Sequence, residues 1–429
     1  MAALVAALLV LLLARTGVAA PRRSTAGAPV GPVIERPTGA LRSCDPLAPV
    51  CVHATSAVPV EALATARVAF SIAWSLVVDT LRVPRPLPDG ARGGDPRLDV
   101  YLVARGTKVP RMLDGLAVGR DPLDLLADRD AASAFLVVDE EAVRAGSCAL
   151  AAIAARGVVR ASTMGLDVAE SEVVVDGFAR RIAEVVAPCP ELERPAFAEL
   201  QARPWRAITA SPAGPHLVAR TLDVQRGSGF GAIVPGVLSM AGNHHGIVVP
   251  AEDDELGPAH FHDDPSVFDV LASSLSDAGS SLDAMFLDVA VARATAPVAP
   301  AWEWTVPVST LPRRFAVRRG IEPTGMTFVR VELDVAPAGD AVEMDLAWEG
   351  GSRFAWRVLK LDAAGRVVSE VPVPPLETTR KITIEARHLS GVRTILLCGV
   401  NLGDPGRPWR PTEPPSPAHG YDLGIFAGS

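Results

Sequence analysis

Lysine and tyrosine are scarce in this sequence, which holds only Lys108, Lys360, Lys381, Tyr101 and Tyr421. Its 41 basic residues are nearly all arginine, and 49 acidic residues outnumber them, so the net charge is −8. An acidic chain with scattered basic residues is not typical of nucleic-acid-binding proteins. A hydrophobic fraction of 49% also excludes a disordered chain. The length of 429 residues predicts two or three domains of roughly 100–200 residues each.

Long apolar runs are missing beyond the N-terminus. Residues 2–14 form one uninterrupted apolar run, but a membrane-spanning helix needs about 20 residues. Small residues follow at 17–20, as in the cleavage zone of a signal peptide. We therefore predict a signal peptide over residues 1–19 and an exported protein, periplasmic or extracellular. No transmembrane segment is expected in the mature chain.

The five cysteines suit an exported protein, because disulfides persist in oxidising compartments. Cys44 and Cys51 flank a short proline-containing turn, so a local bridge is expected there. Cys148 and Cys189 flank one long helical region, whose two ends a bridge would join. Cys398 lies in an apolar run and is expected to be a buried free thiol. Other pairings, and a fully reduced set, stay open at this point.

The spacing of apolar residues divides the chain after a flexible leader, which we assign to residues 20–54. Residues 55–297 are mostly helical in spacing, whereas residues 298–429 alternate apolar and polar residues between turns. Many short alternating runs are typical of a β-sandwich. The predicted fold is an α+β domain over 55–297 followed by an all-β sandwich domain over 298–429. Within the first domain we expect helices at 60–82, 147–162 and 172–187 and strands at 98–104 and 134–139.

Common catalytic motifs are absent from the sequence. Gly236–Met240 is not a nucleophile elbow, and Gly227–Gly231 is not a dinucleotide-binding loop. A zinc hydrolase of the HExxH type needs two histidines one helical turn apart, with a glutamate after the first. None of the eight histidines begins such a motif, so the intact form is excluded.

The order of elements nevertheless resembles a family of secreted bacterial metalloproteases of the zincin type, which carry a C-terminal β-sandwich. The resemblance rests on a helix and a proline-rich loop followed by Asp89-Gly90, on the strands at 98–103 and 135–139, and on later segments at 229–235 and 286–293. It implies a zincin-like fold for the α+β domain. It also implies that the zinc-binding helix lies at residues 155–161 and that Asp176 is at the position of the third ligand.

The zinc-site positions depart from that family. They read Arg156-Gly157-Val158-Val159-Arg160, so arginines replace both histidines and glycine replaces the general base. A guanidinium has no lone pair to offer a metal, and glycine cannot take a proton from water. The resemblance then implies a pseudoprotease with no cofactor. We expect a binding or structural role, with a protein or a cell-surface ligand as the partner.

Two interpretations of the arginine pair remain open. Arg156 and Arg160 lie one turn apart on one helix face, where they could form internal ion pairs or bind the carboxylate of a ligand. The acidic residues nearby that could serve as internal partners are Asp167, Glu170, Glu172 and Asp176.

A histidine-rich loop offers an alternative function. His244, His245, His260 and His262 surround an acidic run at 252–255, and such residues can bind zinc, nickel or copper. On this alternative the protein is a metal-dependent hydrolase with zinc as its cofactor. The competing interpretation is a solvated acidic loop in which Asp263 or Asp264 caps the next helix.

Overall fold

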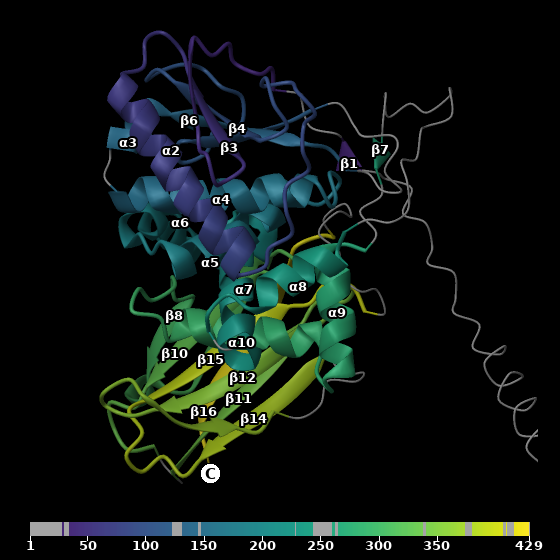
Figure 1. The fold of residues 1–429 in the computed structure, drawn as a ribbon. Helices are drawn as coiled ribbons and strands as arrows, with labels where there is room; N and C mark the ends of the chain where they lie inside the picture. The colour runs from purple at the N-terminus through teal and green to yellow at the C-terminus, as the bar shows by residue number, and fades with distance from the viewer. Residues whose placement is uncertain are drawn as a thin grey trace, which may run out of the picture.

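The computed structural model describes residues 28–29, 34–121, 131–144, 147–227, 229–242, 260–261, 265–337, 340–373, 380–405, 409 and 416–428. Helices dominate the N-terminal half of the chain, and β-sheets make up the C-terminal half (Figure 1). The predicted signal peptide over residues 1–19 lies outside the described residues.

A five-stranded sheet forms one layer of the N-terminal half, with the order β2-β3-β4-β6-β5. The strands are β2 (Leu41–Cys44), β3 (Val50–Ala54), β4 (Leu98–Val103), β5 (Leu116–Arg120) and β6 (Ala134–Asp139). β3, β4 and β6 run parallel, while β2 and β5 are antiparallel edge strands. The parallel strands are buried almost throughout, which explains their near-continuous apolar sequences.

The first four helices of this half are α2 (Val60–Trp74), extended by a π-helical turn at Ser75–Thr80, α3 (Glu140–Arg144), α4 (Ser147–Met164) and α5 (Glu172–Val186). Of these, α2, α3 and α4 pack against the strands, while α5 packs against α4. α4 contacts both β5 and β6 on one side and α2 and α5 on the others. The helices expected at 147–162 and 172–187 are thus both present, and their observed ends differ from the predicted ones by at most two residues.

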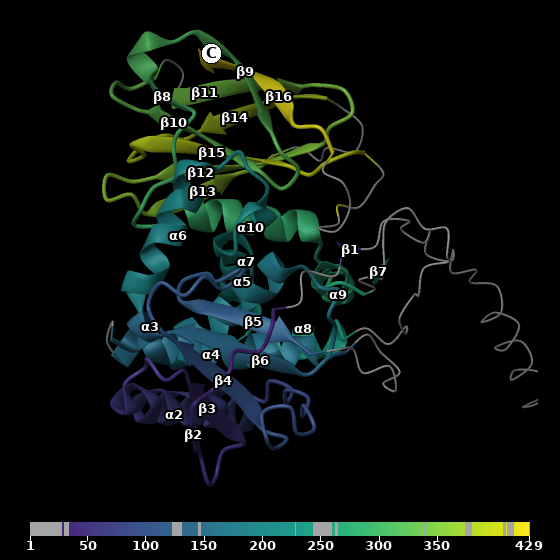
Figure 2. The same ribbon diagram turned by 90° about the horizontal axis from the view of Figure 1, so that it is seen from above.

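A helical layer separates this sheet from the C-terminal half (Figures 1 and 2). It contains α6 (Pro190–Ala202), α7 (Ala213–Arg226), α8 (Ile233–Met240), α9 (Val267–Asp277) and α10 (Leu282–Ala294), with a short 3-10 helix at Ile208–Ala210. α10 contacts α7 on one side and β12 and β15 on the other. The helical layer thus joins the two halves through continuous packing.

Two sheets build the C-terminal half. One has the order β13-β12-β15-β10-β8, and the other has the order β14-β11-β16-β9. Val329 and Leu397 of the first sheet share one buried core with Leu346 and Ile425 of the second. Shared burial between two sheets is consistent with the predicted β-sandwich. The strands are β8 (Trp304–Pro307), β9 (Arg313–Ile321), β10 (Met326–Glu332), β11 (Ala341–Trp348), β12 (Phe354–Leu361), β13 (Val367–Val371), β14 (Lys381–Arg387), β15 (Thr394–Asn401) and β16 (His419–Ala427), with a 3-10 turn at Val308–Thr310.

The leader predicted over residues 20–54 differs from the structure. Residues 41–54 form the β2–β3 hairpin, and β3 is fully buried beside β4. Ile34 packs on the opposite face of the sheet from α2 and α4, with Tyr101 and Phe135. The short strand β1 (Ala28–Pro29) pairs with β7 (His260–Phe261). The alternation in Val50–Ala54 was too short to separate from the surrounding turn residues by sequence pattern alone.

Both expected disulfides are present. Cys44 is bonded to Cys51 and Cys148 to Cys189, while Cys398 is a buried free cysteine. Two disulfides are typical of an oxidising, exported environment.

One helix within the described part of the chain, Val60–Thr80, is long and apolar enough to cross a membrane by length and composition alone. Its buried face, which includes Leu63, Ala66 and Phe70, packs against β3 and α4.

Candidate functional site

Helices α4 and α5 lie side by side and bring the predicted zinc-site positions together (Figure 1). α4 contributes Arg156 and Arg160, and α5 contributes Asp176 and Arg180. In each pair the residues are one helical turn apart, so both side chains point to the same face. Their exposed fractions are 0%, 2%, 1% and 1%, so the whole cluster is buried.

Asp176 is the centre of this cluster, because three guanidinium groups bind its carboxylate. Nε of Arg156 lies 2.7 Å from Oδ1, and Nη1 of Arg160 lies 3.4 Å from the same oxygen. Nε of Arg180 lies 3.0 Å from Oδ2. Both carboxylate oxygens are therefore occupied by charge-assisted contacts.

A ring of less buried carboxylates binds the outer ends of the arginines. Glu172 accepts from Nη2 of Arg160 at 2.6 Å, and Glu193 accepts from Nη1 of Arg180 at 2.9 Å. Asp114, just before β5, binds Arg180 and lies 3.5 Å from Nη1 of Arg156. Three arginines thus face four carboxylates. The cluster is an internally compensated charge network.

Burial and ion pairing act against each other on the charges of this cluster. Burial raises the pKa of Asp176, but the attraction of Arg156, Arg160 and Arg180 outweighs burial and holds that pKa below its usual range. Burial lowers the pKa of Arg156, and Asp176 only partly opposes the effect. A guanidinium nevertheless keeps its proton in proteins. The cluster therefore stays charged, and each charge depends on its neighbours for compensation.

Gly157 does not face this cluster but lies against the sheet. A Cβ at this position would lie 2.8 Å from Cδ1 of Leu136 on β6 and 3.5 Å from Cδ1 of Leu116 on β5. Both leucines are completely buried, so they have little room to move. The absent side chain thus allows α4 to lie close to the sheet.

The four acidic partners considered from the sequence have different roles. Glu172 and Asp176 bind the arginine pair, as the internal-pairing interpretation expects. Oδ1 of Asp167 accepts from the backbone of Ala169 at 2.7 Å. Glu170 accepts from Val267 N at 2.6 Å, at the start of α9. Burial raises the pKa of Glu170 to about 7, although backbone hydrogen bonds from Val267 and Ser171 act to lower it.

Sequence reasoning missed Asp114, Arg180 and Glu193. The spacing of Asp176 and Arg180 at i and i+4 was a usable signal, because such pairs meet on a helix surface. Asp114 comes from a turn 42 residues before Arg156, and no local pattern connects the two.

A second charge cluster, also missed, lies on the face of the sheet opposite α2 and α4. Arg36 donates from Nη2 to Asp89 at 2.6 Å and from Nε to Asp121 at 2.9 Å, and it also binds Asp99. Nε2 of His53 lies 2.8 Å from Asp99. This cluster fixes the segment before β2 to the sheet.

Most of the histidine loop lies outside the described residues. His244, His245 and His262 lie outside the described residues, and His260 is described only as part of the backbone of β7. Within the described ranges, three possible ligands come together at Cys44, Cys51 and Asp95, and at Cys148, Cys189 and Glu191. Both sets contain a disulfide, so their cysteines are not available as thiolates.

Comparisons with known proteins find no matching protein family and no matching curated protein. Solved structures show limited similarity. The pre-peptidase C-terminal domain of a collagenase from Bacillus anthracis is 10% identical, with a TM-score of 0.18 over 30% of this chain and 99% of that domain. The SPBc2 prophage-derived protein YomS is 7% identical, with a TM-score of 0.17 over 27% of this chain and 96% of YomS. Neither similarity assigns a family or a function.

Proposed function

We propose that this protein is an exported, non-catalytic relative of secreted zincin-type metalloproteases, with a zincin-like α+β domain and a C-terminal β-sandwich. Its role is binding or structural, directed at a protein or a cell-surface ligand. One observation carries the proposal. The three positions that the resemblance assigns to zinc ligands meet in space, with Arg156 and Arg160 both against Asp176.

The order of elements also supports the proposal. α2, β4, β6, α4 and α5 follow one another as the resemblance requires, and α4 packs on both β5 and β6. Two helices that place residues 156, 160 and 176 around one point are what a zinc site of this kind needs. Fold alone does not define function, so the chemistry of the residues decides it.

The residues present do not fit a zinc ion. Arg156 and Arg160 offer only donors. The oxygens of Asp176 already accept hydrogen bonds from Arg156 and Arg180 and form an ion pair with Arg160. The three positive charges would also repel a dication. The general-base position is a glycine that faces Leu136. At positions 156, 157, 160 and 176, no side chain could activate a metal-bound water or abstract a proton from it.

Zinc content and peptidase activity of the full chain test the loss of catalysis. We expect substoichiometric zinc after dialysis and no casein hydrolysis. Hydrolysis that a chelator abolishes would overturn the proposal, because it would require an intact metal centre. The same measurement addresses the alternative metal site in the histidine loop.

A restored metal site tests the relationship to zincins separately. The double variant Arg156→His/Arg160→His leaves Asp176 as a third ligand, as in three-ligand zinc sites. We expect it to bind Co²⁺ with a visible absorption band and to gain thermal stability from zinc. Adding Asp176→Asn to the double variant is the matched control and should abolish both effects. Equal metal binding by the double variant and the control would reject the proposed ligand geometry.

A further inference from the structure

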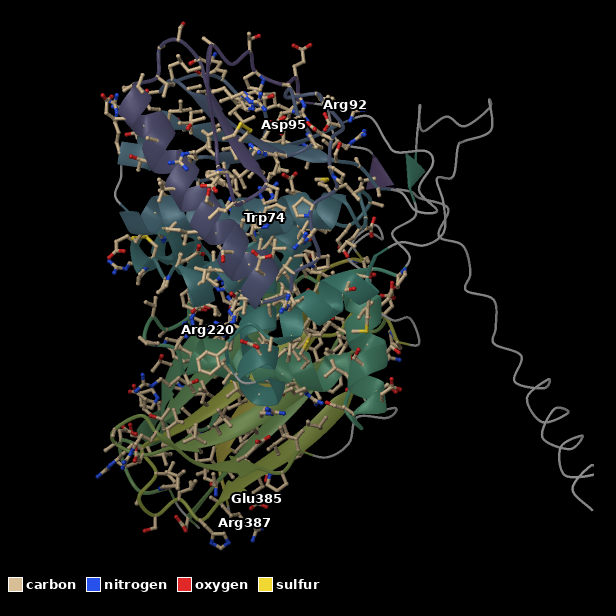
Figure 3. All side chains as sticks on the ribbon, in the orientation of Figure 1. Trp74, Arg92, Asp95, Arg220, Glu385 and Arg387 are labelled. Carbon is tan, nitrogen blue, oxygen red and sulfur yellow. A yellow bond between two sulfur atoms is a disulfide. The ribbon has the colours of Figure 1, made fainter. Side chains whose placement is uncertain are left out.

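A cavity of about 360 Å³ opens between the end of α5, the start of α6 and α7. It lies on the other side of Glu193 from the arginine cluster, since this residue binds Arg180 and also lines the cavity. Arg220 is at its rim, at the level of the helical layer (Figure 3). The volume is at the small end of the range for ligand pockets, about 300–1,000 Å³.

The inner wall of the cavity is apolar and built from small side chains. Ala152 comes from α4, Ala183 and Ala187 from the end of α5 and its cap, and Ala213 from α7, and the ring of Phe197 also lines the cavity. Alanines leave the space that larger side chains would fill. An apolar group of a ligand would therefore be removed from water here, which is favourable.

Two carboxylates line the cavity, and both are already neutralised by cations. Glu184 accepts from Arg181 at 2.6 Å and lies 3.0 Å from Nε2 of His216 and 3.4 Å from Arg220. Burial raises its pKa, but the hydrogen bonds and positive charges of these neighbours outweigh burial and lower the pKa to about 2. Glu193 is bound by Arg180 at 2.9 Å and lies 3.7 Å from Nδ1 of His216. Neither carboxylate would attract a cationic ligand.

Arg194 gives the cavity an available positive charge. It lines the cavity from α6 and is exposed, and it forms no ion pair with any residue that the structure describes. Arg220 adds a second guanidinium, which shares Glu184 with Arg181 and His216. A guanidinium binds a carboxylate through parallel hydrogen bonds, so the rim is suited to an anionic head group.

We propose that this cavity binds a small amphipathic carboxylate, whose apolar group lies among the alanines and Phe197 and whose carboxylate binds Arg194 and Arg220. The carboxylate can belong to a free organic acid or to the C-terminus of a peptide ending in an apolar residue. The inference does not depend on the relationship to metalloproteases. It assigns a ligand class to a site separate from the arginine cluster.

Titration calorimetry on the full chain tests this site with defined probes. The free acids are 3-phenylpropionate and 4-methylpentanoate, and the neutral control is 3-phenylpropionamide. An acetylated peptide ending in phenylalanine, with a free or an amidated C-terminus, is the second source of the same chemistry. We expect the acids, the free-carboxylate peptide or both to bind, while both amides bind at least about tenfold more weakly. Equal binding of acid and amide, or binding of no probe at millimolar concentration, would overturn the proposal.

Two variants locate the bound probe. Arg194→Gln should weaken acid binding about tenfold by removing a charge-assisted contact. Arg203→Gln changes the charge equally near the other end of α6, where Arg203 lies 3.2 Å from Glu199, and should leave binding unchanged. Ala187→Leu should weaken binding as well, because the larger side chain would occupy the space of the ligand's apolar group. Binding that survives both Arg194→Gln and Ala187→Leu would place the ligand elsewhere and reject this site, whatever the zinc measurements show.

Discussion

Nε of Arg156 donates to Oδ1 of Asp176 across 2.7 Å and so links α4 to α5 inside the protein. Such a pair is expensive to bury unless every charge in it is compensated. Arg160, Arg180 and the outer carboxylates provide that compensation. The cluster therefore behaves as one unit, and removal of its centre should affect all members.

Asp176→Asn should destabilise the protein by about 3–5 kcal/mol, because it removes the buried carboxylate that all three guanidinium groups contact. Urea unfolding followed by circular dichroism measures the loss. Glu172→Gln is the matched control, since Glu172 binds only Arg160 of the three and its side chain is 41% exposed. A loss from Asp176→Asn no larger than that of the control would contradict the cooperative cluster.

Gly157→Ala should destabilise the protein by about 1–3 kcal/mol, because its new methyl group would overlap Leu136 in a packed interior. Gly236→Ala is the control in α8, where a Cβ meets nothing within 4 Å. There the higher helix propensity of alanine should stabilise the protein by up to about 1 kcal/mol. Thermal unfolding of both variants gives the comparison. If both substitutions stabilise, α4 does not approach the sheet as closely as described.

The buried carboxyl of Glu170 should make stability depend on pH. Its pKa is raised to about 7 in the folded protein, above the unfolded value of 4.5, so the folded state holds its proton more tightly. The stability contributed by the protonated carboxyl of Glu170 is fully present below pH 4.5 and is lost as the pH rises through 7. Relative to Glu170→Gln, wild type should lose about 2–3 kcal/mol between pH 4.5 and 8. Urea midpoints measured across this range provide the test, and a constant difference would contradict it.

The Cys148–Cys189 bridge should contribute more stability than the Cys44–Cys51 bridge. The two bridges close segments with sequence separations of 41 and 7. The loss of chain entropy in the unfolded state predicts about 4 and 2 kcal/mol respectively. Unfolding of Cys148→Ser/Cys189→Ser and of Cys44→Ser/Cys51→Ser should follow this order. The reverse order would show that contacts in the folded state dominate.

Local patterns in the sequence predicted the elements that carry the site, but not all of its contacts. Helical spacing identified α4 and α5, and burial of the strand at 98–103 follows from its apolar run. The position of Asp114 beside Arg180 depends on how β5 pairs with β6, which is a long-range arrangement. The cavity beside α6 could not be predicted either, because it depends on three helices packing through alanines.

The β2–β3 hairpin shows the same limit within a short segment. Its sequence has Pro46 and Pro49 between Cys44 and Cys51, and this composition favoured a loop. Pairing with β4 and the disulfide nevertheless produce a buried strand at Val50–Ala54. Tertiary contacts override weak local preferences in such short strands.

The contact between Arg36 and the sheet sets an order for assembly. Its partners Asp89, Asp99 and Asp121 follow 53, 63 and 85 residues later in the chain. During synthesis the N-terminal segment emerges first, but it can dock only after those distant residues have come together. Closing such long loops is slow compared with forming the helices. The segment around Arg36 therefore docks late although it is synthesised early, and it docks only on a sheet whose strands are already paired.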